Sequence, residues 1–482
     1  MSAIPLLQSF VNGAFQVPAS DAWMEHVNPS NQRDVIARVA DSTPEEVANA
    51  TIAAAEAQVL WRSVPGPVRA EHLHRWAGAV GARSDEIAKA ISREVGKPIA
   101  EARGEVGRAV VILRYYAGEA VREIGEVIPA QLSGALQFTL REPLGVVALI
   151  TPWNFPLAIP LWKAAPAIAF GNTVVIKPSE MASHVATLLS ETALAAGLPP
   201  GVFNVVLGRG TTMGSHLLRA DAVRGISFTG SSAVGRMVAA IGADRNVRYQ
   251  TEMGGKNVMI VDRDADLDAA ATLAASGAMR YAGQKCTATS RVIVTRDVER
   301  PFLDRLRVQV EALPIGPVDD PAAAVGPLIT TQSRASIQQA LDEAAPERLF
   351  GGTLPDDVRF SEGSYFAPLV IRLEDAGSSL AQRELFGPVL GVLSADGLDH
   401  AIDLANQTPY GLSAALFTRD LRTALRYVHR IDAGLVRVNG DRTGVDPHAP
   451  FGGMKGSSSG SREQGSAARE FYTETKTVQI NP

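Results

Sequence analysis

The chain has 482 residues, and its 46 Lys and Arg against 51 Asp and Glu give a formal net charge of −5. This length exceeds what one hydrophobic core organises, so we expect two or three domains. The chain has no basic block, and its apolar runs are too short to span a bilayer, so we expect neither nucleic acid nor a membrane as partner. A single cysteine excludes an intrachain disulfide. Together with an N-terminus that lacks a secretory pattern, it predicts a cytoplasmic protein.

The first quarter of the chain is predicted to be mainly helical. Asn12-Gly13 between apolar residues predicts a tight hairpin. A capping pattern at residues 42–46 predicts the start of a helix that runs to Trp61. Periodic apolar positions predict three further helices, at residues 68–83, 85–95 and 99–120.

From residue 144 onward, short β-branched runs alternate with helical stretches. The first predicted strands are residues 145–151, 173–177, 203–207, 225–229 and 257–261. A second series includes residues 290–295, 387–393 and 435–439. Such alternation is typical of parallel sheets with crossover helices. We therefore predict an α/β protein with two α/β domains and Cys286 near their junction.

The C-terminal tail ends in a predicted strand. Residues 471–480 alternate in polarity as a strand does. A terminal strand needs a partner, which is either a hairpin at residues 137–141 of this chain or the edge of another subunit.

Cys286 is the first candidate for chemistry. A lone cysteine is otherwise an inert core residue. Its polar neighbours, Gln284, Lys285, Thr287 and Thr289, predict an accessible site, and the adjacent ammonium would favour the thiolate. Two reactions are then open, hydrolysis through a Cys–His pair or oxidation through a thiohemiacetal. None of the eight histidines stands in a hydrolase signature, which favours oxidation.

A carboxylate and an amide complete the candidate catalytic set. Glu252 is followed by Gly254-Gly255, which permit close backbone approach, and by an apolar strand. In a partly dry cleft such a carboxylate has a raised pKa and can deprotonate water. Asn154 lies in Thr-Pro-Trp-Asn-Phe-Pro. It is either a turn residue or a rigid NH₂ donor to a developing oxyanion.

Two segments carry signals for a dinucleotide. Residues 230–235, Gly-Ser-Ser-Ala-Val-Gly, follow a strand and open a helix, so their amides could meet a pyrophosphate. Lys177 and Glu180 end another strand. This pattern is either a capped helix start or a pair that holds ribose hydroxyls. An acid there would repel a 2′-phosphate, so NAD is favoured over NADP.

In this order and spacing, the segments resemble the NAD(P)-dependent aldehyde dehydrogenase superfamily over almost the whole chain. The specific set is Glu252 with Gly-Gly-Lys, Cys286, residues 384–388 (Glu-Leu-Phe-Gly-Pro) and residues 450–453 (Pro-Phe-Gly-Gly). The resemblance is nearest to the α-ketoglutaric semialdehyde (2,5-dioxopentanoate) dehydrogenases, through residues 283–291 and 444–465. The chain departs from that subgroup at Asp441-Arg442-Thr443, where Pro-Thr-Ala is usual.

The resemblance implies roles residue by residue. Cys286 would be the nucleophile, Glu252 the general base and Asn154 the oxyanion donor. No metal site is implied. The residues implied to contact NAD are Trp153, Lys177, Glu180, Gly230, Ser231, Gly235, Glu384 and Phe386.

The resemblance also implies an architecture of two Rossmann-like α/β domains and an oligomerisation arm. Residues 1–122 and 143–254 would form the NAD-binding domain, and residues 255–440 the catalytic domain. Residues 123–142 and 455–482 would form an arm of strands through which copies associate as a dimer or tetramer.

The substrate would be a small aldehyde. The candidate contacts are Phe155, Trp162, Lys163, Lys285, Arg442 and Phe451. The three cations could meet the distal carboxylate of a dicarboxylic semialdehyde, such as α-ketoglutaric semialdehyde. If they point elsewhere, an aromatic or aliphatic aldehyde fits better. The rival hypotheses are a CoA-acylating dehydrogenase and a family member without catalytic activity.

Overall fold

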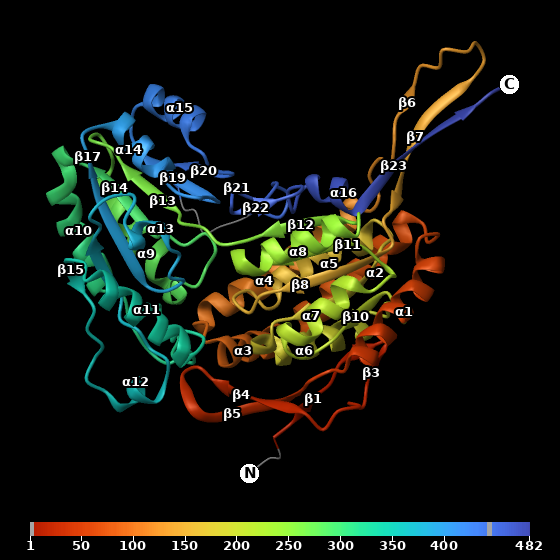
Figure 1. The fold of residues 1–482 in the computed structure, drawn as a ribbon, viewed down its shortest axis with the longest axis horizontal. Coiled ribbons are helices and arrows are strands. Elements are labelled where there is room, and N and C mark those ends of the chain that lie inside the picture. The colour runs from red at the N-terminus through yellow and green to blue at the C-terminus, as the bar shows by residue number, and fades with distance from the viewer. Residues whose placement is uncertain (1–3, 441–445) are drawn as a thin grey trace.

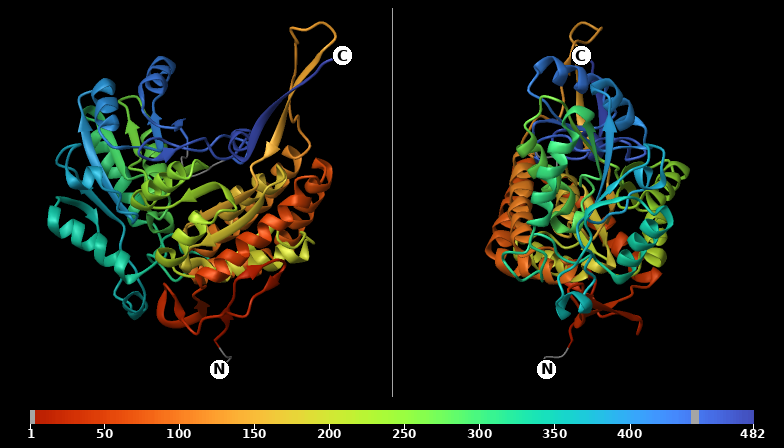
Figure 2. Two further views of the ribbon diagram at one scale, coloured as in Figure 1. Left: turned by 45° about the vertical axis from the view of Figure 1, so that its right-hand side comes forward. Right: turned by 90° about the vertical axis from the view of Figure 1, so that its left-hand side faces the viewer.

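The computed structural model describes residues 4–440 and 446–482. They form two α/β bodies, each built on its own sheet, and a narrow arm that projects away from both (Figure 1). The C-terminus lies on the arm and the N-terminus at the far end of the molecule, as two further views also show (Figure 2). None of the described helices is long and apolar enough to cross a membrane. The predicted α/β class with two sheets and an arm of strands is confirmed.

The first body is built on a sheet of eight strands within the described residues. In spatial order these are β22 (Ser458–Ser459), β12 (Arg248–Glu252), β11 (Val223–Thr229), β8 (Val146–Thr151), β9 (Thr173–Pro178), β10 (Phe203–Val205), β2 (Phe10–Val11) and β3 (Ala14–Phe15). The five strands from β12 to β10 are parallel, and antiparallel strands extend both edges. Of these five, β12 alone was not predicted, because its sequence Arg-Tyr-Gln-Thr-Glu lacks an apolar run.

Helices cover both faces of this sheet because side chains alternate along its strands. Val147 and Leu149 of β8 pack on one face, and Val146 and Ala148 pack on the other. The first face is covered by α2 (Gly66–Ala82), α3 (Ser84–Val95), α4 (Ile99–Glu119), α5 (Ala158–Ala169) and α6 (Ser183–Ala195). The second is covered by α1 (Pro44–Trp61), α7 (Gly210–Arg219) and α8 (Ser232–Asp244). Burial on both faces explains the continuous apolar runs of the parallel strands.

The N-terminal predictions are confirmed in part. Asn12 and Gly13 have φ of 53° and 79°, as a tight hairpin between β2 and β3 requires. Thr43 and Glu46 form a capping box at the start of α1. The first quarter also holds β1 (Leu6–Leu7), β4 (Trp23–Asn28) and β5 (Asn31–Ala40), which form a separate sheet. These strands were missed because polar residues interrupt their apolar positions.

The second body is built on a sheet of seven strands among the described residues. In spatial order these are β15 (Arg348–Gly351), β16 (Leu369–Arg372), β17 (Val389–Ala395), β14 (Arg291–Thr295), β13 (Val258–Val261), β19 (Ser413–Phe417) and β20 (Leu435–Val438). All neighbours are parallel except β15 and β16. Its helices are α9 (Leu267–Met279), α10 (Glu299–Glu311), α11 (Thr331–Ala344), α13 (Ser379–Gln382), α14 (Leu398–Asn406) and α15 (Leu421–Arg430). The strand predicted at residues 257–261 therefore belongs to this sheet.

The arm is a three-stranded sheet in the described part of the chain. β23 (Thr473–Ile480) pairs antiparallel with β7 (Leu136–Pro143), which pairs with β6 (Val127–Ile128). The tail strand thus finds its partner in this chain. It begins at Thr473, after α16 (Ala467–Tyr472). The remaining short elements are β18 (Tyr410–Gly411), β21 (Met454–Lys455), α12 (Val358–Glu362), η1 (Glu180–Ala182), η2 (Arg280–Gly283) and η3 (Arg296–Val298).

The carboxyl ends of the parallel strands position the candidate site. Asn154 follows β8, Lys177 lies at the end of β9, Gly230 follows β11, and Glu252 ends β12. In an open parallel sheet the carboxyl ends of the strands all lie at the same end of the sheet, and ligands bind there. The fold therefore brings four of the predicted residues to one side of the first sheet.

Candidate active site

A strained segment leads into the loop that carries Cys286, residues 284–289. In η2, Tyr281, Ala282 and Gly283 have φ of 56°, 51° and 67°, so three successive residues are left-handed. Such conformations are costly for residues other than glycine and cluster at functional sites. A Cβ on Gly283 would lie 2.4 Å from the carbonyl oxygen of Gly387. The tight backbone here therefore requires glycine and fixes where Cys286 emerges.

Two buried amide side chains hold this loop. Asn257 donates through Nδ2 to the carbonyl oxygens of Cys286 at 2.7 Å and Ala288 at 2.8 Å. Gln284 accepts from the backbone N–H of Ile329 at 2.8 Å. Residues Gln284, Lys285, Thr287 and Thr289 are all buried, whereas Cys286 is half-buried. The sequence suggested an accessible loop, but these polar neighbours of Cys286 are buried. Gln284 instead connects the loop to Ile329 through a hydrogen bond.

The thiol of Cys286 has a raised pKa in this environment. Burial raises its pKa to about 12, and the nearby carboxylates of Glu384 and Glu252 act in the same direction. Lys285 does not counter this effect, because its Nζ forms an ion pair of 2.9 Å with Oε2 of Glu101. The prediction that the adjacent ammonium favours the thiolate is wrong for this state.

Glu252 lies buried at the end of β12. The Ser458 hydroxyl donates to its Oε2 at 2.6 Å, and Oε1 has no hydrogen-bond partner among the described residues. Burial raises the pKa of Glu252 well above its ordinary value, and the carboxylate of Glu463 adds to the shift. A carboxylate with a raised pKa is a better proton acceptor than an exposed one.

Asn154 connects the first sheet to the loop that carries Cys286. Its side chain is buried, and Nδ2 donates to the carbonyl oxygen of Gln284 at 3.0 Å. An amide NH₂ carries two donors, so one N–H is left for another acceptor. Asn154 is therefore hydrogen-bonded to Gln284, the residue two positions before Cys286 in the sequence.

Lys163 is engaged inside the protein. It is fully buried, forms an ion pair with Glu463, and donates to the Ser227 hydroxyl at 2.8 Å. Its neighbour Trp162 packs against Phe451 with ring centroids 5.4 Å apart. Lys163 thus has its carboxylate partner within the chain. Arg442, the third cation predicted to meet a substrate, lies outside the described residues.

The predicted cofactor contacts include an aromatic pair, Trp153 and Phe386, and the carboxylate of Glu384. The rings of Trp153 and Phe386 meet edge-on at 5.6 Å. Phe386 has φ of 55°, which is unfavourable for an aromatic residue. Glu384 accepts from the Gly255 N–H at 3.1 Å, and burial raises its pKa to about 7. A Cβ on Gly254 would lie 2.0 Å from that carboxylate, so glycine makes room for it.

The residues predicted to meet a dinucleotide have suitable chemistry. Ser231 caps α8, with its Oγ accepting from Val234 N–H at 3.5 Å. A Cβ on Gly235 would lie 2.4 Å from the Met253 sulfur, so the helix packs directly on the strand end. Lys177 and Glu180 form an ion pair of 3.2 Å. A helix N-terminus suits phosphate, and a Lys–Glu pair supplies donors and acceptors for hydroxyls.

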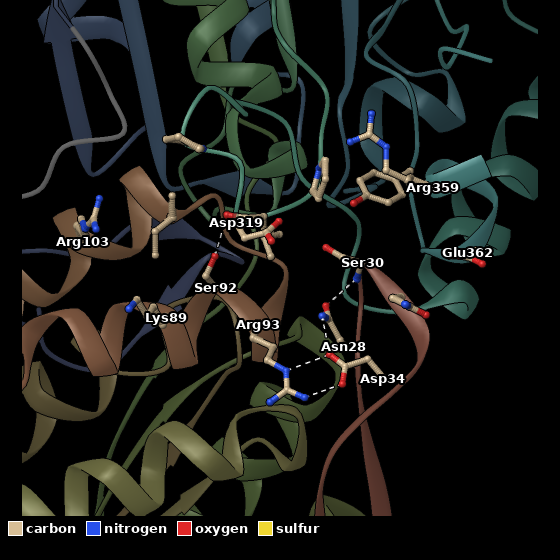
Figure 3. Close-up of a pocket in the computed structure, with 16 residues that line it drawn as sticks. Asn28, Ser30, Asp34, Lys89, Ser92, Arg93, Arg103, Asp319, Arg359 and Glu362 are labelled. Carbon is tan, nitrogen blue, oxygen red and sulfur yellow. Dashed lines mark hydrogen bonds and ion pairs between the residues drawn. The ribbon is translucent and has the colours of Figure 1, made fainter. Parts of the chain in front are cut away.

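A separate pocket contains none of the predicted site residues, and the described residues offer no metal site. A pocket of about 690 Å³ between the β4–β5 turn, α3, α4 and residues 317–321 is lined in part by Arg93 and Asp34, which pair with each other (Figure 3). The described residues that line it include none of the predicted site residues. In the described ranges, no group of three or more His, Cys, Asp and Glu side chains could hold a metal ion.

Several residues of the site were not found from the sequence. Asn257 stands close to the Glu252 motif, and a buried amide after Gly-Gly-Lys was a usable signal. Ser458 lies in a Gly/Ser-rich stretch that shows no strand pattern, yet β22 pairs it directly with Glu252. Glu463 is buried and Glu101 is partly buried, and the environment of both charged residues follows from tertiary contacts alone.

The geometry agrees with comparisons to known proteins. The model of the aldehyde dehydrogenase family matches residues 16–478. The chain therefore belongs to the aldehyde dehydrogenase family, as the resemblance predicted.

Similar proteins cover the full length of the chain. An alpha-ketoglutaric semialdehyde dehydrogenase of Bacillus subtilis is 42% identical over 98% of both chains. A 2,5-dioxopentanoate dehydrogenase of Saccharolobus solfataricus is 36% identical over 95% of this chain and 98% of its own. The structure of an NAD-dependent aldehyde dehydrogenase from Sinorhizobium meliloti has a TM-score of 0.95 and 36% identity, covering 99% of this chain and 95% of its own. Betaine aldehyde dehydrogenase of Staphylococcus aureus, solved with NAD+, matches at a TM-score of 0.95 and 31% identity, over 98% of this chain and 95% of its own.

Proposed function

We propose that the protein oxidises α-ketoglutaric semialdehyde (2,5-dioxopentanoate), or a related dicarboxylic semialdehyde, to the carboxylate with NAD as acceptor. The observation that carries the proposal is that Asn154 and Glu252 both lie close to the loop of Cys286. Asn154 is hydrogen-bonded to that loop, and the carboxylate of Glu252 is near enough to raise the pKa of the thiol. A thiol, an amide donor and a carboxylate base are the groups needed to form and hydrolyse a thioester. The names of the full-length relatives support the substrate class.

Cys286 begins the reaction as nucleophile. Its thiol first loses its proton to solvent; the thiolate sulfur then adds to the aldehyde carbon while the carbonyl electron pair moves to oxygen, giving the oxyanion of a thiohemiacetal. The free N–H of Asn154 and the backbone N–H of Cys286 donate to that oxygen. NAD, when bound, supplies the acceptor for the hydride that leaves the same carbon. The product on the enzyme is a thioester of Cys286.

Glu252 completes the reaction as general base. It takes a proton from water, whose oxygen attacks the thioester carbon. The carbon–sulfur bond then breaks and the carboxylate leaves. The overall balance converts aldehyde, NAD and water to carboxylate, NADH and protons. Burial of Glu252 and its hydrogen bond to Ser458 support this role, because they set both its basicity and its orientation.

The proposed cofactor site uses residues at the strand ends. Lys177 and Glu180 would bind the adenosine ribose, and Gly230 with Ser231 would face the pyrophosphate at the start of α8. Glu384 would hold the nicotinamide ribose. Two further contacts are Trp153 and Phe386. The acid at Glu180 supports NAD over NADP, because it repels a 2′-phosphate.

We also propose the domain and assembly scheme that the sequence suggested. Residues 1–122 and 143–254 would bind NAD, and residues 255–440 would carry the nucleophile. The arm of residues 123–142 and 455–482 would join copies into a dimer or tetramer, supported by the long β7–β23 pairing that projects from the body (Figure 1). We place the protein in the cytoplasm, which its single cysteine supports.

An absorbance assay for NADH tests this function. Purified protein with NAD is offered 2,5-dioxopentanoate, succinic semialdehyde, benzaldehyde and butanal. We expect turnover that is highest for the dicarboxylic semialdehydes and absent in Cys286→Ala. Turnover that strictly required coenzyme A would contradict the role of water and Glu252. Absence of NADH with every aldehyde would contradict the proposed function as a whole.

A further inference from the structure

The ion pair between Lys285 and Glu101 shows where helix α4 meets the nucleophile loop. Lys285 directly precedes Cys286, and Glu101 lies in the first turn of α4. Their charged atoms are 2.9 Å apart, and the two side chains are 9% and 19% exposed. The start of α4 therefore lies against the reactive loop, joined to it by an ion pair that is largely withdrawn from solvent.

One stripe of α4 runs from this pair to an open pocket. With about 100° per residue, positions spaced by seven lie nearly above one another on a helix. Glu101, Arg108 and Tyr115 share such a stripe. Tyr115 lines a pocket of about 690 Å³, whose other walls include His448 and Arg469. The stripe thus leads from the reactive loop toward solvent.

Aromatic side chains lie beside the same stripe. Glu105, one turn from Glu101, accepts from the N–H groups of Leu157 and Ala158, so it faces the start of α5. That helix carries Trp162, which packs on Phe451. The indole Nε1 of Trp162 is buried without a hydrogen-bond partner among the described residues. Trp162 and Phe451 therefore form a buried apolar wall beside α5.

Arg108 lies on this stripe of α4, and among the described residues it has no ion-pair partner. It is half-buried, and no hydrogen bond or ion pair joins it to another part of the described chain. Its neighbours are paired, Lys97 with Glu105 and Lys285 with Glu101. A guanidinium withdrawn from water without an acceptor is unfavourable, and it matches a carboxylate in a two-bonded geometry.

We propose that Arg108 binds the distal carboxylate of the substrate and thereby sets the preference for dicarboxylic semialdehydes. This inference rests on the proposed function. The four carbon–carbon bonds between aldehyde and carboxylate of 2,5-dioxopentanoate span about 5 Å. Helix side chains lean toward the N-terminus, so Arg108 leans back toward Glu101 and the reactive loop. Glu101 already neutralises Lys285, whereas Arg108 has no ion-pair partner among the described residues.

Substitution of Arg108 tests the inference, with Arg114 as a matched control. Arg114 lies on the same helix, is exposed, and points to another side. The readout is the ratio of kcat/KM for 2,5-dioxopentanoate to kcat/KM for butanal. Arg108→Met should lower this ratio about 10- to 100-fold, mainly through a higher KM for the acid, because a hydrogen-bonded charge pair is lost. Arg114→Met should leave it unchanged, and Arg108→Lys should restore part of it.

The outcomes separate this inference from the proposed function. An unchanged ratio in Arg108→Met, while the wild-type protein oxidises both aldehydes, overturns the role of Arg108 and leaves the function standing. An equal fall for both substrates also overturns it, because the side chain would then act on folding or chemistry. Failure of the wild-type protein to oxidise any aldehyde removes both.

Discussion

The hydroxyl of Ser458 donates a 2.6 Å hydrogen bond to Oε2 of Glu252, across 206 positions of the chain. The contact exists because β22 adds an antiparallel edge to β12 and pairs these two residues directly. A hydrogen bond to the ionised form of a carboxylate lowers its pKa. Ser458 therefore opposes the effects of burial and Glu463, which raise the pKa of Glu252.

Ser458→Ala should move the acid limb of the pH–rate profile to higher pH. Without the hydroxyl, the ionised form of Glu252 loses a stabilising contact, so its pKa rises further and less base is present at a given pH. A hydrogen bond to a charged group contributes about 1.5 kcal/mol, and its loss corresponds to a shift of the pKa by about one unit. The check is kcat against pH for wild type and variant. A limb that stays in place or moves to lower pH would contradict the assignment of Glu252 as base.

Alkylation should report the environment of the single cysteine. Burial and the neighbouring carboxylates hold the pKa of Cys286 near 12, so iodoacetamide should react slowly at neutral pH and faster as pH rises. Glu384→Gln removes one of the charges that raise this pKa. At mildly alkaline pH the variant should therefore react several-fold faster. Intact mass gives the rate, Cys286→Ala is the blank, and a slower reaction in Glu384→Gln would contradict the electrostatic account.

The buried pair of Lys163 and Glu463 should be costly to break. Removal of one partner leaves a charge without compensation, so Glu463→Gln should reduce the free energy of unfolding by about 3–5 kcal/mol. The double variant Lys163→Met with Glu463→Leu removes both charges and should recover part of that loss. Urea unfolding followed by tryptophan fluorescence measures both. Equal stability of Glu463→Gln and wild type would show that the pair is not formed.

Glu180→Ala should relax the choice of cofactor. The carboxylate of Glu180 is held by Lys177 at the end of β9, where it would repel a 2′-phosphate. Its removal leaves the ammonium free to meet that phosphate. The ratio of kcat/KM for NADP to that for NAD should rise about tenfold, since a like charge is lost and a cation is released. An unchanged ratio would place the adenosine ribose elsewhere.

Removal of β23 should affect association more than chemistry. A chain that ends at Tyr472 leaves β7 with an unpaired edge in the arm. We expect a smaller oligomer in sedimentation analysis than for the full chain. An unchanged oligomer would contradict the assembly role of the arm.

Local signals predicted much of the fold. The hairpin at Asn12-Gly13, the capping box at Thr43 and the apolar parallel strands depend on nearby residues, and all are present. β12 escaped prediction because its residues are polar although they lie between two strands. The sequence did not decide whether β23 pairs within this chain or with another subunit, and in the structure it pairs with β7.

The predicted site was less complete than the predicted fold. The sequence predicted Cys286, Glu252 and Asn154 as site residues, and the fold brings them close to one another. It could not reveal that Lys285 is paired with Glu101, because ion pairs between distant segments leave no local pattern. For the same reason, the sequence did not reveal that Lys163 is paired with Glu463.

The central claim is that Cys286 carries the substrate as a thioester that Glu252 helps to hydrolyse. The most direct test mixes Glu252→Gln with NAD and 2,5-dioxopentanoate, stops the reaction with acid, and measures the mass of the peptide that contains Cys286. The account predicts one acyl group on that peptide, with a burst of NADH close to one per active site and slow turnover afterwards. An unmodified peptide together with a steady-state rate equal to that of wild type would contradict it.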